Sequence, residues 1–440
     1  GNFSLRSLAA TLTPEAALAA ARSQSTTLSG PMRQKAADMT LAYRVEGTVG
    51  PTVYVFTPVG SDATGFMIVS ADDTARPLLG YSDESTFDPA NIPPQLQWML
   101  SSYSTTIEAI AVDSEGTAAM RLSRESSSGS RLRAPQGKIA PLCATKWNQD
   151  KPYNNSCPIV GGSRSVTGCV ATAMAQVMKV HQWPQQGTGS HTYQFTYNGA
   201  TYQDSFNFGG TNFNWSKMQN TYTSTNYTTS SANAVATLMH ACGVAADMEY
   251  SPDASGASEY DAASGMIEYL GYDAAMTVES RYWYTASAWD SLIYGELSAS
   301  RPVLYCGNDQ TSGHAFVCDG YDGNSYFHIN WGWSGTADGY FLLADLNPYT
   351  QGIGGGSGEQ GFNWGQTAII GTKPAVSGST RPMVMGTTGD ITVDAASYPR
   401  NSSSTMYIGS SDGFYNYSTY TLTNFYIGLI LEGTSGRQYM

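Results

Sequence analysis

The chain has 440 residues, too many for one ordinary hydrophobic core, so two or three domains are expected. Its net charge is −13 with only 22 basic residues, and no Lys/Arg cluster could neutralise a row of phosphates, which argues against a nucleic-acid partner. No window approaches the roughly 18 to 20 uninterrupted apolar residues of a membrane helix. We therefore expect no membrane span, and a signal peptide that is either absent or already removed.

Composition also bears on the compartment. Charged residues make up only 13% of the chain, while Ser, Thr, Gly, Asn and Tyr are abundant, a balance typical of secreted β-rich proteins. The cysteines form no Cys-x-x-Cys pair, and a chain of this size needs no disulfide framework, so most are expected to be reduced and buried. They are Cys143, Cys157, Cys169, Cys242, Cys306 and Cys318. No pattern indicates a metal ion or another cofactor.

The first part of the chain, residues 1–138, has the pattern of an α+β module. Residues 4–22 predict a short helix with Thr13 as its cap and Pro14 in its first position. Strand patterns follow at "LAYRVEG", "TVYVFTP" and "GFMIVSAD", and "IPPQLQWMLSSYSTTIEAIA" restores a helical period. The Ser-, Gly- and Arg-rich stretch 121–138 has little to bury and predicts an exposed linker. Such a segment is either a passive tether or a site where proteases cut.

The largest unit is expected at residues 139–375. Helical patterns lie around "SANAVATLMHACGV" and "AWDSLIYGELSAS", and strand patterns lead to "AIIGTKP". From 376 to 440, "MVMGTTGDITVDA" and "YTLTNFYIGLILEGTS" predict the strands of a small β-sandwich-like module. The sequence ends just after a strand pattern, so whether this last module is complete stays an open question.

One helical pattern begins with a cysteine. In "SVTGCVATAMAQVMKVHQWP", Cys169 follows Gly168 and precedes apolar residues three or four apart, and Pro184 ends the pattern. At a helix N-terminus the free backbone N–H groups and the helix dipole favour the thiolate, which activates a nucleophile. A small cysteine packed in the core would give the same pattern, so both interpretations stay open on this stretch alone.

A nucleophilic thiol needs a base within hydrogen-bond distance, usually a histidine, and a third group that orients the ring. The chain has five histidines. His181 lies on the same helical pattern, about 18 Å from Cys169 at a rise of roughly 1.5 Å per residue, which is too far. His240 lies in an apolar helical run, and His191 lies in a polar loop without supporting context. The two histidines of "SGHAFVCDGYDGNSYFHINWGWSG" remain.

That segment has the pattern of a β-hairpin, with β-rich runs at "HAFVCD" and "YFHINW" around the turn "GYDGN". Folding the chain about this turn sets His314 opposite Asn330, about 5 Å apart on one face. The Asn330 oxygen would then hold the imidazole in one tautomer, with Trp331 and Trp333 shielding the bond from water. In the alternative, His314 is a strand-end residue and the tryptophans belong to the core.

The oxyanion of a tetrahedral intermediate needs a further donor, commonly a glutamine side chain beside the N–H of the nucleophile. Gln149, in "TKWNQDKPYN" ahead of Cys169, is a candidate, although a surface glutamine has the same pattern. The chemistry also requires that the Cys169 sulfur and the His314 imidazole face each other across a groove, close enough to share a proton.

Four strings resemble, in order, those of the streptopain family, secreted bacterial cysteine proteases with a papain-like fold that include interpain. They are "KWNQDKPYN", "TGCVATAMAQVMKVHQWP", "GHAFVCDGYD" and "FHINWGWSGTADGYFLLADLNP". The resemblance implies Cys169 as nucleophile and His314 as base and later acid. It also implies Asn330 as the residue that orients the ring, and Gln149 in the oxyanion hole.

The same resemblance implies residues that support the substrate cleft, namely Trp331, Trp333, Gly168 and Gly313. The stretch "GIGGGSGEQGFNWG", residues 352–365, is similar to the family's Gly-rich loop near the cleft, where glycine would permit motion over the substrate. Cys306 departs from the family pattern, and both a Cys306–Cys318 bridge and a buried free pair stay open.

The string "GFMIVSADDTARPLLGYSDESTFDPANIPPQL" is similar to the family's pro-segment, which folds on the enzyme and blocks the cleft. The expected fold is therefore α+β: an inhibitory α+β pro-domain at 1–138, a papain-like two-subdomain protease at 139–375, and a β-module at 376–440. The expected function is a cysteine endopeptidase made as a zymogen, secreted or held at the bacterial surface or periplasm, acting on polypeptides. A Cys-His acyltransferase or amidase, and a surface adhesin with an inert papain-like domain, stay as alternatives.

Overall fold

The computed structural model describes most of the chain. The described ranges are 11–23, 38–60, 64–73, 75–116, 137–281, 284, 286–308, 313–343, 365–386, 391–393, 408–410, 415–421, 430–433 and 436–439. The predicted linker, apart from its last two residues, and the Gly-rich loop, apart from Gly365, lie outside these ranges. We call 11–116 the N-terminal module, 137–375 the central unit and 376–439 the C-terminal segment.

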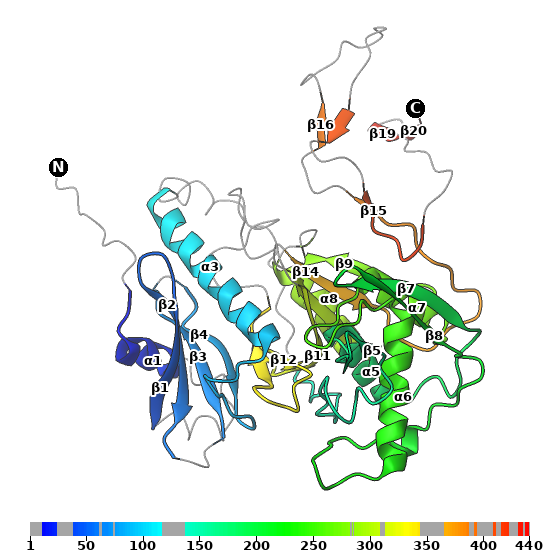
Figure 1. The fold of residues 1–440 in the computed structure, drawn as a ribbon. Coiled ribbons are helices and arrows are strands. Elements are labelled where there is room, and N and C mark those ends of the chain that lie inside the picture. Colours follow the sequence, from blue (N-terminus) through cyan, green and yellow to red (C-terminus); the bar gives the residue numbers. More distant parts are fainter. Residues whose placement is uncertain are drawn as a thin grey trace, which may run out of the picture.

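Ten strands form one antiparallel sheet that continues from the N-terminal module into the central unit (Figure 1). Their order is β1-β2-β3-β4-β13-β12-β11-β10-β14-β9. The strands are β1 (Met39–Glu46), β2 (Pro51–Pro58), β3 (Phe66–Ser70), β4 (Leu78–Ser82), β9 (Thr277–Ser280), β10 (Val303–Asn308), β11 (Gly313–Tyr321), β12 (Phe327–Asn330), β13 (Gly339–Phe341) and β14 (Gln366–Ile370). The sequence predicted two separate modules, whereas the pairing of β4 with β13 joins their strands into one sheet.

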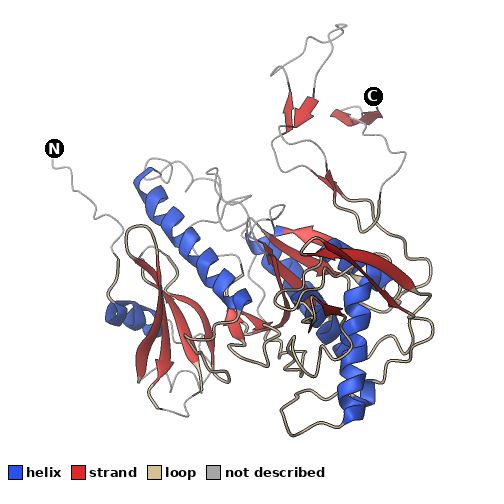
Figure 2. Cartoon of the chain, viewed as in Figure 1, coloured by secondary structure: helices blue, strands red, loops and turns tan. Residues whose placement is uncertain are grey.

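The central strands separate two hydrophobic cores, because side chains alternate between the faces of a strand. On β10, Val303 and Tyr305 belong to the core shared with α1, α3 and α8, while Leu304 and Cys306 belong to the core shared with α5, α6 and α7. Figure 2 shows α3 lying across the strands of the N-terminal module, with the other long helices in the central unit. The helices are α1 (Pro14–Ser23), α3 (Pro94–Gly116), α5 (Cys169–His181), α6 (Thr229–Ala245), α7 (Glu259–Glu268) and α8 (Ala286–Ser298), with a 3₁₀ turn at η1 (Trp215–Lys217).

Most of the predicted helices are confirmed. Helix α1 begins at Pro14, and the Thr13 hydroxyl accepts a hydrogen bond from the Ala16 N–H at 3.3 Å, as its position as cap predicted. Helices α3, α5, α6 and α8 fall on the predicted stretches. Helix α7, which has only ten residues, was missed. His191 begins a strand rather than lying in a loop.

The hairpin β11–β12 forms, but its predicted register is wrong. Val317, not His314, lies opposite Asn330, because the turn is centred later than expected and the register shifts between Cys318 and Gly320. The offset between His314 and Val317 is three residues. An odd offset moves a side chain to the other face of a sheet, so His314 and Asn330 start on opposite faces.

Smaller two-stranded ladders complete the structure. They are β5 (Ile159–Val160) with β6 (Ser163–Arg164), β7 (His191–Tyr197) with β8 (Ala200–Phe206), β15 (Met385–Gly386) with β18 (Tyr415–Asn416), β16 (Ile391–Val393) with β17 (Ile408–Ser410), and β19 (Ile430–Gly433) with β20 (Gly436–Tyr439). In the described parts of the C-terminal segment the strands pair two by two, and the expected sandwich-like module stays a prediction. The segment is attached to the central unit at Asp273, whose carboxylate accepts hydrogen bonds from the Ser379 hydroxyl and the Val376 N–H.

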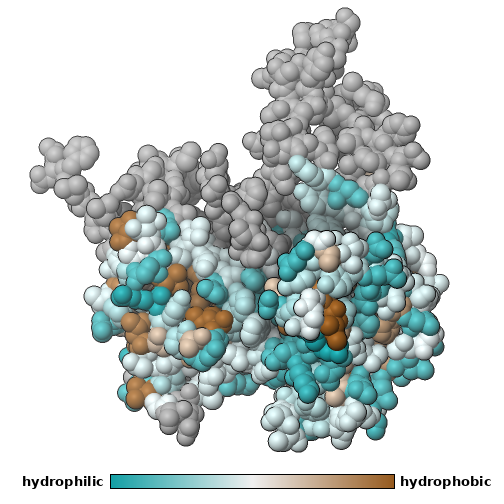
Figure 3. Space-filling model, in the orientation of Figure 1, coloured by the Kyte–Doolittle hydropathy of each residue, from teal (hydrophilic) through white to brown (hydrophobic). Residues whose placement is uncertain are grey.

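The surface differs between the two ends of the sheet. On the face shown in Figure 3, hydrophilic colours predominate over the central unit, and apolar patches are more frequent over the N-terminal module. Val49 and Val59 of that module are among its exposed apolar side chains. None of the helices in the described ranges has the length and apolar character needed to cross a bilayer.

The junction of β4 with β13 leaves no room for an added side chain at Gly339. Tyr340 pairs with Tyr81 across the junction, and their rings stack with centroids 5.3 Å apart. A Cβ on Gly339 would lie 2.5 Å from the Tyr81 carbonyl oxygen and 2.9 Å from the Ser82 Cβ. Because the first of these atoms belongs to the backbone of β4, the strand itself would have to move.

We therefore expect Gly339→Ala to lower the free energy of unfolding by about 1 to 3 kcal/mol through overpacking. Differential scanning calorimetry of the full chain would show this as a lower melting temperature. Gly295→Ala is the matched control, since Gly295 is exposed on α8 with nothing within 4 Å of its added Cβ. A Gly339→Ala protein that melts like wild type would contradict the tight junction.

Candidate active site

Cys169 lies at the first position of α5, as predicted, and its backbone entry into the helix depends on Gly168. Gly168 is the N-cap with φ 85°, a conformation that favours glycine. An added Cβ there would lie 2.7 Å from the Met248 sulfur and 2.9 Å from the Ser255 carbonyl oxygen. Cys169 is half-buried, whereas the other five cysteines are buried, and all six are free. The Cys306–Cys318 bridge is therefore not formed.

The pKa of the Cys169 thiol departs from the sequence expectation. Burial raises the pKa above its usual value, and hydrogen bonds from the backbone of Ala315, Val170 and Cys169 itself only partly offset this. The helix N-terminus does favour the thiolate, but desolvation of the sulfur under the surrounding chain is the larger effect. The hydrogen bond from the Ala315 backbone also places the Cys169 sulfur against strand β11. Ala315 is the residue that follows His314.

His314 begins on the opposite face of β11 from this contact. His314 pairs with Gly307 of β10, so the His314 side chain and a Cβ added to Gly307 would lie on the same face of the sheet. A Cβ on Gly307 would lie 2.4 Å from the indole ring of Trp98 on α3, so that ring covers this face. Cys169 therefore contacts the β11 backbone beside His314. The His314 side chain leaves the strand on the opposite face, which the N-terminal module covers.

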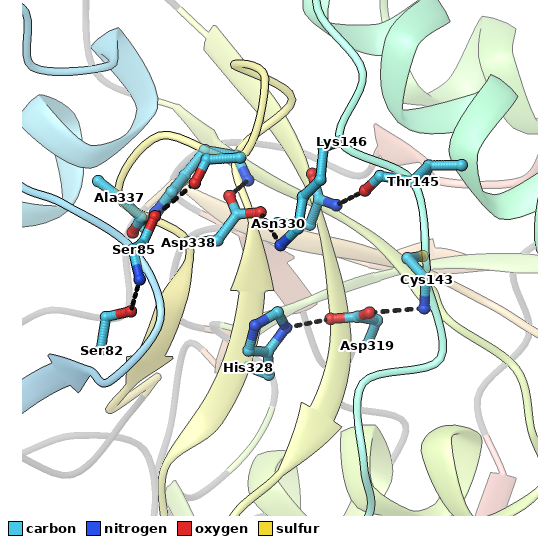
Figure 4. Close-up of polar contacts among 12 residues, drawn as sticks. Ser82, Ser85, Cys143, Thr145, Lys146, Asp319, His328, Asn330, Ala337 and Asp338 are labelled. Carbon is cyan, nitrogen blue, oxygen red and sulfur yellow. Dashed lines mark hydrogen bonds and ion pairs between the residues drawn. The ribbon is translucent and has the colours of Figure 1, made fainter. Parts of the chain in front are cut away.

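Asn330 is buried, and its side chain makes three hydrogen bonds. Its Oδ1 accepts hydrogen bonds from Gln176 Nε2 and from the Gly332 N–H, both at 3.1 Å, and its Nδ2 donates to the Thr145 carbonyl at 2.7 Å (Figure 4 shows the bond to Thr145). The expected bond from the His314 ring to Asn330 is not among these contacts. The reason is the hairpin register, which sets Asn330 on the face that packs against α5.

The backbone of Gln149 is hydrogen-bonded to the segment that leads into α5. The Thr167 N–H donates to the Gln149 carbonyl at 3.0 Å, which ties this loop to the residue two positions before Cys169. Gln149 is half-buried, as a residue at the wall of a cleft would be. This backbone hydrogen bond brings Gln149 next to Thr167, two residues before Cys169.

The two tryptophans have different surroundings. Trp331 is fully buried, donates from Nε1 to the Ala337 carbonyl at 2.9 Å and packs against Phe316 and Phe341, so it is a core residue. Trp333 is half-buried and packs at the edge of the same core. Gly313 is the exposed first residue of β11, directly before His314.

The second histidine of the hairpin, His328, belongs to a buried polar group (Figure 4). Its Nδ1 lies 2.6 Å from the Asp319 carboxylate, which also accepts from the Cys143 N–H at 2.7 Å. Burial lowers the pKa of His328, but the charge and hydrogen bond of Asp319 outweigh it, so the pKa is raised. The Asp319 carboxylate thus links the His328 ring to the Cys143 backbone, and we assign His328 a structural role.

A cavity of about 510 Å³ lies between the N-terminal module and the central unit. Its lining includes Tyr81, Asp83, Lys146, His328 and Asp338, with Lys146 paired to Asp338 at 2.9 Å. None of the predicted catalytic residues lines this cavity. Within the described ranges, no cluster of three His, Cys, Asp or Glu side chains could hold a metal ion.

Sequence reasoning missed one buried residue next to the site, Gln176. Helix α5 is apolar apart from a polar stripe, because Thr172 and Gln176 follow Cys169 at i+3 and i+7 on the same helical face. Thr172 Oγ1 lies 2.8 Å from Thr167 Oγ1, and Gln176 contacts Asn330. Polar residues at these spacings in an apolar helix are the sequence signal that could have revealed them.

Comparisons with known proteins identify the family of the chain. Residues 147–341 match the Peptidase C10 family, and residues 9–107 match the Spi protease inhibitor family. Streptopain of Streptococcus pyogenes is 33% identical over 345 residues, which cover 74% of this chain and 81% of streptopain. The thiol protease/hemagglutinin PrtT of Porphyromonas gingivalis is 33% identical over 320 residues, covering 71% of this chain and 36% of that protein.

A solved structure is also similar. A fragment of prointerpain A from Prevotella intermedia, in a cysteine-to-alanine mutant, superposes with a TM-score of 0.61 at 33% identity. The match covers 76% of this chain and all of that fragment. The fold is thus that of an α+β papain-like cysteine protease with a pro-domain, as predicted.

The chain belongs to the Peptidase C10 family of streptopain-like proteases. It is a cysteine-type endopeptidase, and its N-terminal module is an inhibitor-like pro-domain.

The raised pKa of Cys169 predicts how the full chain reacts with an alkylating agent. The thiolate is the reactive form, so a raised pKa means little thiolate at neutral pH and a rate that keeps rising above the ordinary pKa of cysteine. Iodoacetamide labelling followed by mass spectrometry from pH 6 to 10 would measure this profile. Cys169→Ala should abolish the fast labelling, because the other thiols are buried. A rate already at its plateau at neutral pH would contradict the prediction.

Proposed function

We propose that this endopeptidase acts through Cys169 as nucleophile, His314 as base and then acid, and Gln149 in the oxyanion hole. The observation that carries the proposal is the placement of the Cys169 sulfur against the β11 backbone beside His314, at the N-terminus of α5. The hydrogen bond from the Thr167 N–H to the Gln149 carbonyl supports the third assignment. An extended polypeptide is the proposed substrate.

The proposed reaction has two steps. His314 takes the thiol proton as the Cys169 sulfur attacks the peptide carbonyl, and the Gln149 side chain and the Cys169 N–H donate to the oxyanion. The C–N bond breaks, the amine leaves with the proton from His314, and an acyl-enzyme remains. A water molecule then gives its proton to the same ring, attacks the acyl carbon and releases the acid and the free thiol.

The pro-domain is proposed to keep this pair apart. Trp98 of α3 covers the face of β10 and β11 on which His314 starts, and its ring lies 6.3 Å from that of Phe316. Removal of the pro-domain would uncover this face and let the His314 side chain turn to the face of Cys169, with Gly313 as the pivot before it. Asn330 would then orient the ring, which requires Gln176 or Gly332 to share its oxygen.

The domain limits and the compartment are part of the same proposal. We propose an inhibitory pro-domain at 1–138, a catalytic domain at 139–375 and a β-module at 376–440, with a cut in the linker releasing the active enzyme. Secretion, or exposure at the cell surface or periplasm, is supported by the low share of charged residues, 13%. Trp331 and Trp333 are proposed to support the cleft from the core side.

Processing of the full chain tests the nucleophile. Wild type should release a fragment cut between Arg131 and Ile139 and then hydrolyse fluorogenic peptides, whereas Cys169→Ala should lose activity by about 10³-fold or more. Cys242→Ala is the control, since this thiol is buried in α6. N-terminal sequencing and peptide assays give the two readouts. Equal processing and turnover by Cys169→Ala and wild type would contradict the proposal.

The oxyanion assignment predicts a change confined to turnover. Gln149→Ala should lower kcat by about 10² to 10³-fold with little change in KM, because the lost donor acts only on the oxyanion. Steady-state kinetics on the processed enzyme would measure the two constants separately. Gln194→Ala, an exposed position on β7, is the control. A loss seen in KM alone would indicate ordinary substrate contact instead.

A further inference from the structure

Three buried side chains form a closed ring of hydrogen bonds beneath the proposed catalytic residues. Gln176 Nε2 donates to Asn330 Oδ1 at 3.1 Å, Asn330 Nδ2 donates to the Thr145 carbonyl at 2.7 Å, and Thr145 Oγ1 donates to Gln176 Oε1 at 2.8 Å. Each of the three side chains is at most 1% exposed. The ring joins helix α5, strand β12 and the loop that leads to Gln149.

This ring fixes the orientation of the Asn330 amide. A buried amide can be placed either way round, and its partners decide between oxygen and nitrogen. Here Gln176 and the Gly332 N–H offer hydrogens to one end, and the Thr145 carbonyl accepts from the other. Turning the amide over would set donors against donors and an oxygen against an oxygen, so Oδ1 stays on the side of α5.

Gln176 and the nucleophile share one rigid element. Seven residues span nearly two turns of an α-helix, so Gln176 lies on the same face as Cys169, roughly 10 Å along the axis. Gln176 is itself held from a second side, because its Oε1 also lies 3.5 Å from the Trp147 N–H. A shift of β12 or of the 145–149 loop relative to α5 would break these bonds.

We propose that Gln176 is a positioning residue for the peptidase reaction. It holds the Asn330 oxygen toward α5 and fixes the distance between the nucleophile helix and the loop that carries Gln149. It touches neither substrate nor reacting atoms and acts through Asn330 and Thr145. This inference rests on the proposed function of Cys169, His314, Asn330 and Gln149.

Two substitutions at Gln176 separate positioning from simple packing. Gln176→Met keeps the approximate shape but removes every hydrogen bond, and we expect kcat to fall about tenfold to a hundredfold with KM within about threefold. Gln176→Glu keeps the acceptor for Thr145, and only its protonated form can donate to Asn330. Its kcat relative to wild type should therefore fall as pH rises through the pKa of the new carboxyl group.

The variants are made in the full chain and converted by a trace of wild-type enzyme, so that processing does not depend on their own activity. Val177→Ala is the matched control, a fully buried neighbour on α5 outside the hydrogen-bonded ring. Thr145→Val serves as a milder second variant if Gln176→Met does not fold, and should lower kcat severalfold through the same ring. Melting temperatures are measured for every variant.

The outcomes distinguish this inference from the proposed function. If Gln176→Met and Thr145→Val lose melting temperature like Val177→Ala but keep its kcat, and Gln176→Glu follows the wild-type pH profile, Gln176 is a packing residue and the inference is overturned. If wild type and Cys169→Ala turn over peptide equally, the proposed function fails instead. A selective fall in kcat, together with the altered pH profile of Gln176→Glu, supports the positioning role.

Discussion

The alternation of side chains across strand β11 is the constraint on which the rest of the structure depends. Val317 and Cys318 of β11 pair with β10 on one side and with β12 on the other, so their backbone cannot rotate without breaking two ladders of hydrogen bonds, whereas His314 pairs with β10 alone. Ala315 and Val317 therefore face the core of α5, and Phe316 and Cys318 face the core shared with the pro-domain. The relation of Cys169 to His314 follows from this assignment of faces.

The same constraint links latency to folding. The pro-domain extends the sheet at β13 and covers one face of β10 and β11 with α3, so it packs on the structure that positions the proposed base. On the other face, packing of Cys169 against the core of α5, α6 and α7 desolvates the thiol, which raises its pKa against the effect of the helix N-terminus. Under the proposed roles of Cys169 and His314, the covered face and the raised pKa of the thiol would both oppose reaction in the intact chain.

Several features were predictable because their causes are local. The cap at Thr13, the start of α5 at Cys169 and the existence of the β11–β12 hairpin each depend on a few neighbouring residues. The hairpin register was not predictable from its turn sequence, because the turn is centred later than expected and the shift between Cys318 and Gly320 then moves the partner of Asn330 back by one residue, to Val317. The ring of Gln176, Asn330 and Thr145 joins three segments that no local pattern relates, although the polar stripe on α5 indicated one member.

The sequence by itself determined the class of enzyme and the presence of an inhibitor-like pro-domain, since these depend on motifs in a fixed order. Cys169 as the nucleophile stays a prediction from residue types at short spacing. Only the tertiary structure decided which face His314 occupies, which partners Asn330 binds and whether the helix dipole or burial controls the thiol. Those outcomes depend on sheet register and on packing between segments far apart in the chain. A register offset by an odd number of residues reverses a face without altering any local pattern.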